Sequence, residues 1–187
     1  MNYYGAKELA DRFRTVRKNT LIIANDIPEE HYGFRAAPEI RSIAEMLVHV
    51  AITPRVQERI HGTERRTSLR DFDFPGILAA MRAEEQTARS KAQIIALLQE
   101  GGDHFSNWIE SLTDEFLGER VNFRPGMVPP FKSRFEMLLA VKEHEMHHRG
   151  QLMLMERMLG IVPHLTREMQ ARLAEPAAAE AEARAKA

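Results

Sequence analysis

Apolar residues recur every three or four positions along most of the chain. The first series consists of Leu9, Phe13, Val16, Thr20, Ile23 and Ile27. Steps of three and four place side chains on one face of a helix, so the series predicts an amphipathic helix over about residues 6–27. Pro28 ends this helix, and residues 28–38 are expected to form a connecting loop.

Three further helices are predicted to begin at a serine followed three residues later by a glutamate or glutamine. These pairs are Ser42 with Glu45, Ser90 with Gln93, and Ser133 with Glu136. In such a capping box the two side chains satisfy exposed amides of the first helical turn. We expect helices over about residues 42–60, 90–112 and 133–159. Pro54 should kink the first of these just past His49, because it frees the carbonyl of Val50.

One pair of glycines leaves a local alternative open. Gly101 and Gly102 fall inside the helix over 90–112, so either that helix breaks or another group approaches its backbone closely. A short helix is expected to begin near Pro75, and residues 121–130 to form a crossover loop. No alternating strand pattern is present.

These elements predict an all-α fold, a four-helix bundle with long crossover connections. The bundle domain should span residues 1–165. Residues 166–187 form a C-terminal tail, helical or disordered, because its end is rich in Ala, Glu and Arg without an apolar stripe.

Composition narrows the possible functions. The 187 residues include 26 Lys plus Arg and 27 Asp plus Glu, a net charge of −1 that gives no reason to expect a nucleic-acid partner. No apolar run approaches the roughly 20 residues that span a bilayer, and the N-terminus lacks the apolar core of a signal peptide. We therefore expect a cytoplasmic location without membrane contact. Cysteine is absent, so any metal must use nitrogen and oxygen ligands.

Three histidines predict a metal site. His144 and His148 lie four residues apart on the apolar side of the last helix, so they project together and could chelate one ion. His49, on the core side of a different helix, supplies a third ligand. Three neutral imidazoles leave coordination positions open, as in a catalytic site, and such ligands suit Zn²⁺ or Ni²⁺. The alternative is that these are core histidines held by ordinary hydrogen bonds.

Three neighbours are candidates for orienting the imidazoles or a bound water. Gln151 and Glu45 lie a turn from His148 and His49, respectively, and His147 flanks the pair on its helix. An ordinary surface hydrogen bond or cap explains Gln151 and Glu45 equally well.

At these residues the chain resembles the DinB/YfiT-like superfamily of metal-binding four-helix bundles. The resemblance covers about residues 1–165 and is carried by four segments: EHYGFRAAP at 30–38, SIAEMLVHVA at 42–51, LTDEFL at 112–117 and HEMHHRGQ at 144–151. It implies His49, His144 and His148 as ligands, and a metal-dependent enzyme such as a thiol S-transferase that uses a low-molecular-weight thiol, a thiol-dependent isomerase or a hydrolase. Its members would bind a small-molecule substrate.

Two other functions are also compatible with this sequence. Residues 144–148 also match H-E-x-x-H, the zinc metallopeptidase signature in which the glutamate is the general base. No downstream third ligand has the required spacing, so Glu145 is expected to be a solvated helix residue. A non-catalytic metal-binding or stress-associated bundle is the third alternative.

We also expect a homodimer. The family resemblance motivates this prediction, together with apolar residues expected to be exposed in the connections, Phe72, Phe74 and Phe131.

Overall fold

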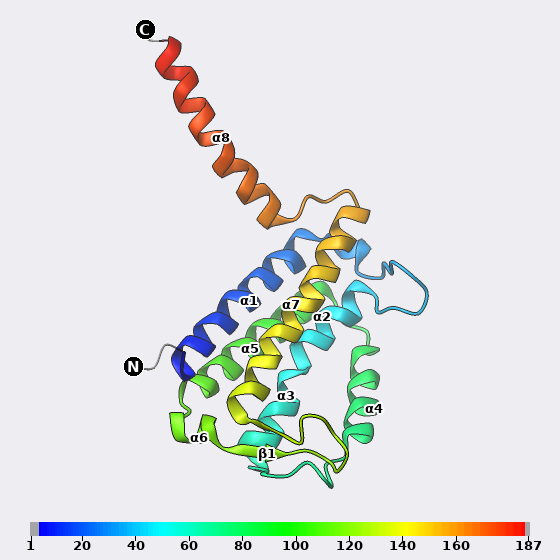
Figure 1. Ribbon diagram of the computed structural model, residues 1–187. Helices are drawn as coiled ribbons and strands as arrows, with labels where there is room; N and C mark the ends of the chain where they lie inside the picture. The colour runs from blue at the N-terminus through cyan, green and yellow to red at the C-terminus, as the bar shows by residue number, and fades with distance from the viewer. Residues whose placement is uncertain (1–3, 186–187) are drawn as a thin grey trace.

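The computed structural model describes residues 4–185, and helices make up most of it (Figure 1). Its α-helices are α1 (Ala6–Asp26), α2 (Ile43–Ile52), α3 (Pro54–Gln57), α4 (Phe74–Glu85), α5 (Lys91–Glu110), α6 (Asp114–Gly118), α7 (Arg134–Met158) and α8 (His164–Ala185). A 3₁₀ turn, η1 (Glu29–His31), and a π-helical turn, η2 (Glu58–Thr63), lie between them. All three predicted serine capping boxes are present, at Ser42, Ser90 and Ser133.

The four-helix bundle is confirmed and consists of α1, α2, α5 and α7. The first helix packs against α5 and α7, and α2 packs against the same two, so α1 and α2 lie diagonally across the bundle (Figure 1). The chain therefore crosses the bundle end twice, between α1 and α2 and between α5 and α7. Every apolar position predicted for α1 is buried, which explains why that helix can face the centre of the bundle.

Pro54 divides the predicted second helix. The α-helix ends at Ile52, and α3 begins at Pro54 and continues into η2. Because proline has no N–H, the carbonyl of Val50 lacks its helical donor, as the sequence predicts. The guanidinium of Arg17 takes that place, with Nη2 donating to Val50 O over 3.2 Å.

The glycine pair does not break α5, which is continuous through both residues. Arg17 crosses the backbone at Gly102, where a Cβ atom would lie 2.8 Å from Arg17 Cγ. Its Nη1 also donates to Leu98 O over 2.6 Å. Of the two alternatives, close approach by another group is correct, and any larger residue at position 102 would displace Arg17.

Several connections differ from prediction. A two-stranded hairpin pairs β1 (Arg120–Asn122) with β2 (Phe131–Ser133), and strands of three residues are too short to show an alternating pattern. The short helix α4 begins at Phe74, one residue before Pro75, with Asp73 as its cap.

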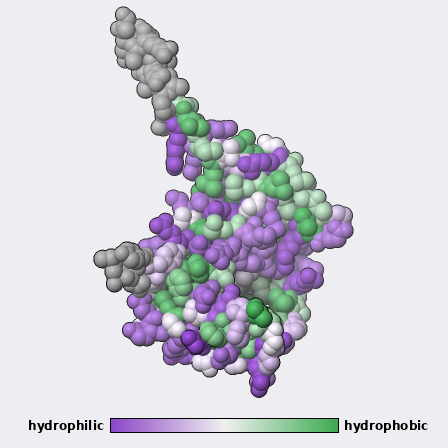
Figure 2. Space-filling view, in the orientation of Figure 1, coloured by the Kyte–Doolittle hydropathy of each residue, from purple (hydrophilic) through white to green (hydrophobic). Residues whose placement is uncertain are grey.

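The apolar residues expected to be exposed are only partly so. Phe72 is buried and Phe74 half-buried, because both pack in a small apolar cluster under the hairpin; Phe131 alone is exposed. Hydrophobic surface instead gathers around the end of α7 and the start of α8 (Figure 2). The exposed residues there are Leu154, Met158, Val162, Met169 and Leu173. Dimerisation stays a prediction, which light scattering at micromolar concentration tests.

The last helix, α8, projects away from the bundle (Figure 1). It begins at His164, so the predicted tail is helical over its described part. Residues 1–3 of the predicted bundle domain and residues 186–187 of the predicted tail lie outside the described residues. Over residues 4–185 the structure has no helix long and apolar enough to cross a membrane.

Candidate metal centre

The structure brings together the three histidines selected from the sequence. His144 Nε2 lies 3.2 Å from His49 Nε2 and 3.1 Å from His148 Nε2. Within the described part of the chain, these three form the one group whose ligand atoms could hold a metal ion, all within 4.8 Å of one another. His49 comes from α2 and the other two from α7, so residues 95 positions apart in sequence meet here.

Hydrogen bonds on the far side of two rings determine where their protons sit. His49 Nδ1 lies 2.7 Å from Glu85 Oε1, and His148 Nδ1 lies 2.8 Å from Gln151 Oε1. A carboxylate or amide oxygen accepts, so each ring carries its proton on Nδ1 and presents a lone pair at Nε2.

A count of protons then shows that the three nitrogens suit a cation. His144 Nε2 carries at most one hydrogen and can donate to only one of its two neighbours. At least one of the contacts at 3.1 and 3.2 Å therefore joins two lone pairs. A divalent ion accepts all three lone pairs at once, and neutral imidazole is its usual nitrogen ligand.

The rings are held neutral at physiological pH. Burial, followed by the charges that His148 and His49 would carry, lowers the pKa of His144 to about 4. Burial also lowers the pKa of His148 to about 4, against the opposing hydrogen bond of Gln151. For His49, burial lowers the pKa and the bond to Glu85 partly opposes it. Metal ligation needs this unprotonated form, so no proton has to be removed from the binding nitrogens near pH 7.

Of the neighbours predicted to orient these rings, the structure places Gln151 beside His148 and Glu45 away from His49. Gln151 does contact His148, and its amide nitrogen donates to Nε2 of the exposed His147 over 3.2 Å, which fixes the orientation of the amide. Glu45 does not contact His49: its carboxylate caps the amide of Ser42 and pairs with Arg35. A glutamate from a different element, Glu85 of α4, takes that role for His49.

Glu145 is buried, and the expectation that it is solvated is wrong. Its carboxylate accepts two hydrogen bonds from Arg17, at Nε and Nη2, both over 2.9 Å. Thr20 donates a third over 2.7 Å. All of these donors belong to α1, so Glu145 faces the bundle interior between α7 and α1.

Another buried histidine serves a different end of the bundle. The Nδ1 atom of His61 accepts from Arg134 over 2.9 Å, and its Nε2 lies 3.0 Å from Gln57 Oε1. Arg134 in turn pairs with Glu119. This network anchors the start of α7 and contributes nothing to the metal centre.

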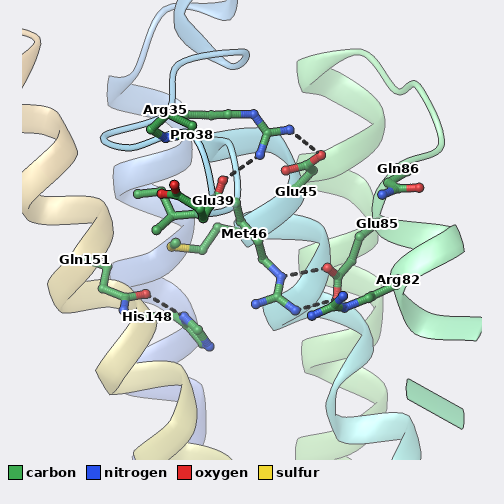
Figure 3. Close-up of a pocket in the computed structure, with 12 residues that line it drawn as sticks. Arg35, Pro38, Glu39, Glu45, Met46, Arg82, Glu85, Gln86, His148 and Gln151 are labelled. Carbon is green, nitrogen blue, oxygen red and sulfur yellow. Dashed lines mark hydrogen bonds and ion pairs between the residues drawn. The ribbon is translucent and has the colours of Figure 1, made fainter. Parts of the chain in front are cut away.

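A cavity of about 620 Å³ opens beside the histidines (Figure 3). Gln151 and His148 of α7 lie on one side of it, and Arg82 and Glu85 of α4 lie on the other. The loop before α2 and the first turn of α2 complete the wall. The volume is within the range of about 300–1,000 Å³ usual for small-molecule sites.

The structural roles of three charged residues, Arg17, Glu145 and Glu85, were not predicted from the sequence. Arg17 and Glu145 carried a readable signal: Arg17 lies four residues from Phe13 and three from Thr20, inside the apolar series, and Glu145 lies between Val141 and His148 at helical spacing. A charge inside an apolar series needs a partner, and the two could have been matched. Glu85 carries no such signal, because it ends a short helix outside the bundle.

The comparisons with known proteins agree with this fold. The model of the DinB superfamily matches residues 12–152. A search of curated proteins finds no match. Among solved structures, the chain is similar to YfiT from Bacillus subtilis, described as a probable metal-dependent hydrolase with an unusual four-helix bundle topology, with 15% identity and a TM-score of 0.66 over 86% of this chain and 91% of that one.

Two more solved structures show the same likeness. A DinB-like protein, YjoA, from Bacillus subtilis matches with 18% identity and a TM-score of 0.59, over 82% of this chain and 92% of that one. A protein from Streptococcus pneumoniae matches with 18% identity and a TM-score of 0.60, over 84% and 93%. At such identities the likeness concerns the fold alone. The sequence match spans most of the chain, and the protein therefore belongs to the DinB superfamily.

Proposed function

We propose that this protein is a metal-dependent enzyme that binds one divalent ion, zinc or nickel, through His49, His144 and His148, and activates a thiol or a water. The convergence of three neutral Nε2 atoms, with too few protons to hydrogen-bond one another, carries the proposal. YfiT, which has the same fold, is described as a probable metal-dependent hydrolase, and this supports it further.

The residues around the site have separable roles. A bound divalent ion would supply Lewis acidity, lowering the pKa of a thiol or water so that it attacks an electrophile near neutral pH. Glu85 and Gln151 hold the rings of His49 and His148 in the tautomer that presents Nε2. Thiol transfer and hydrolysis both use these roles, so the ligand set serves either reaction.

The cavity favours an enzyme over a non-catalytic metal-binding bundle. A site sealed by apolar side chains would have no room for a reactant. Here His148 itself lines a cavity of about 620 Å³, together with charged and amide side chains. A small molecule could therefore reach the metal centre from this side.

The metallopeptidase alternative loses its general base. Arg17 and Thr20 occupy the Glu145 carboxylate, and Glu145 is 2% exposed. Glu145→Gln should lower stability but leave the metal content of each folded chain unchanged. Loss of turnover by several orders of magnitude in a folded, metal-loaded Glu145→Gln protein would restore the general-base role.

Metal analysis of the purified protein tests the proposal. Elemental analysis should find about one zinc or nickel ion per chain in the parent and almost none in His144→Ala. The matched control is His104→Ala, because the His104 side chain is 75% exposed and lies outside the cluster. Full metal occupancy in His144→Ala, or equal loss in both variants, would contradict the proposed ligands.

An activity screen then tests the enzyme. The metal-loaded parent should conjugate a low-molecular-weight thiol to an electrophile, or hydrolyse a small substrate, and His144→Ala should do neither. Catalysis that persists after removal of the metal by a chelator would argue against metal dependence.

A further inference from the structure

The cavity beside the metal centre has an uneven charge balance once an ion is bound. Three arginines and three glutamates line it, and these cancel. The three histidines are neutral, so a divalent ion on them would leave two positive charges without compensation. Such a pocket favours a ligand that carries negative charge.

Two of the three arginines already have carboxylate partners. Arg41 pairs with Glu85, with Nε donating over 2.6 Å, and Arg35 pairs with Glu45 over 2.6 Å. Both oxygens of Glu85 are occupied, since Oε1 also accepts from His49. Glu45 and Glu85 are thus both engaged, and neither is left to neutralise a further guanidinium.

Arg82 is the third arginine, and within the described residues its side chain has no hydrogen bond or ion pair. It extends from α4 toward the cavity, on the side of Glu85 and opposite His148 (Figure 3). Glu39 is the remaining glutamate, and it lies across the cavity from Arg82 in that view, without an ion pair between them. The guanidinium N–H groups of Arg82 are thus free to donate to a ligand in the cavity.

We propose that Arg82 binds a carboxylate of the small-molecule substrate, whose thiol or hydrolysable group reaches the metal beside His148. The inference rests on the proposed function and names its substrate class. A planar guanidinium pairs with a carboxylate through two parallel hydrogen bonds. A ligand with one thiolate and one carboxylate carries two negative charges, which balance the two positive charges of the divalent ion. Pro38, Ile40 and Met46 on the wall suit the apolar stem that joins the two ends of such a ligand.

Cobalt-loaded protein allows the test without knowledge of the substrate. A thiolate that binds Co²⁺ produces a sulfur-to-cobalt absorption band, so its dissociation constant can be titrated directly. Two thiols of equal length serve as probes: 3-mercaptopropionate, which carries the carboxylate, and 3-mercapto-1-propanol, which does not. The ratio of their dissociation constants measures recognition of the carboxylate.

The parent should bind 3-mercaptopropionate about tenfold more tightly, the effect expected of one charge-assisted pair. Arg82→Gln should reduce the ratio to within about twofold. The control Arg172→Gln removes the same charge from an exposed position on α8, outside the cavity, and should keep the parent's ratio.

The outcomes separate this inference from the proposed function. Failure of the histidines to take up cobalt refutes the proposed function itself. Cobalt uptake with equal affinity for the two thiols, with binding of neither, or with an unchanged ratio in Arg82→Gln overturns the role of Arg82 and leaves the metal site standing.

Discussion

Replacing Arg17 by methionine should destabilise the metal-free protein more than any single change on the surface of α1. Arg17 is 3% exposed and Glu145 2% exposed, so the substitution leaves a carboxylate in the core with only Thr20 as a donor. The carbonyl of Val50 also loses the donor that replaces its missing helical partner. Two groups are thus left unsatisfied by one substitution.

The magnitude follows from these two groups. Breaking a buried ion pair by removing one partner costs about 3–5 kcal/mol, because the remaining charge stays buried. An unsatisfied buried carbonyl adds about 1–3 kcal/mol. The expected loss of about 4–8 kcal/mol approaches the whole stability of a domain, about 5–15 kcal/mol. Thr20→Val, which removes one hydrogen bond to Glu145, should cost only about 1–3 kcal/mol and stay folded.

A double-mutant cycle supplies the decisive measurement. Urea unfolding with a chelator, followed by helical circular dichroism, gives the free energy of unfolding for Arg17→Met, Glu145→Met and the double variant. Replacing both ions removes the unpaired charge, so the double variant should lose less stability than either single one. Arg14→Met is the control on the same helix: its ion pairs are exposed, and it should cost at most about 1 kcal/mol. Additive losses in the double variant would refute a coupled, buried pair.

Three further predictions concern metal and pH. Zn²⁺ should stabilise the folded parent by up to about 4 kcal/mol at a thousandfold excess over Kd, and its melting temperature should rise accordingly. His49→Ala should lose most of this rise, and equal shifts in the two proteins would mean that His49 is not a ligand. With a chelator, stability should fall as pH drops from about 6.5 toward 4. Burial and the charge of Arg134 lower the pKa of folded His61 to about 4, and burial does the same for His144 and His148, so the unfolded chain takes up these protons first. His61→Gln should remove the share of this slope that His61 contributes, and an unchanged slope would contradict the prediction. The contribution of Glu156 to stability has the opposite pH dependence. Burial and the Asp26 charge raise the pKa of Glu156 to about 7, so stability is lost as pH rises through 7. In thermal melts, Glu156→Gln should therefore stabilise the protein more at about pH 8 than at about pH 5, and equal effects at both would argue against a buried, protonated carboxyl.

The sequence alone determined whatever depends on neighbours within one helical turn. A serine three residues before Glu136 specifies a helix start, and His144 and His148 must share a helix face because four residues make about one turn. The apolar series placed His49 on the core side of its own helix. Proline at position 54 likewise specified which carbonyl would lose its donor, by covalent structure alone.

Tertiary structure alone decided which groups meet across the bundle. Glu85 reaches His49 over 36 positions, and Arg17 reaches Glu145 over 128, through the packing of α4 on α2 and of α1 on α7. Helical periodicity tells which residues share a face, yet it does not order four helices around a core, nor set the rotation of one helix against the next. The burial of Glu145 and the free guanidinium of Arg82 beside the cavity follow from those rotations, because a shift of one position on a helix turns a side chain by about 100°.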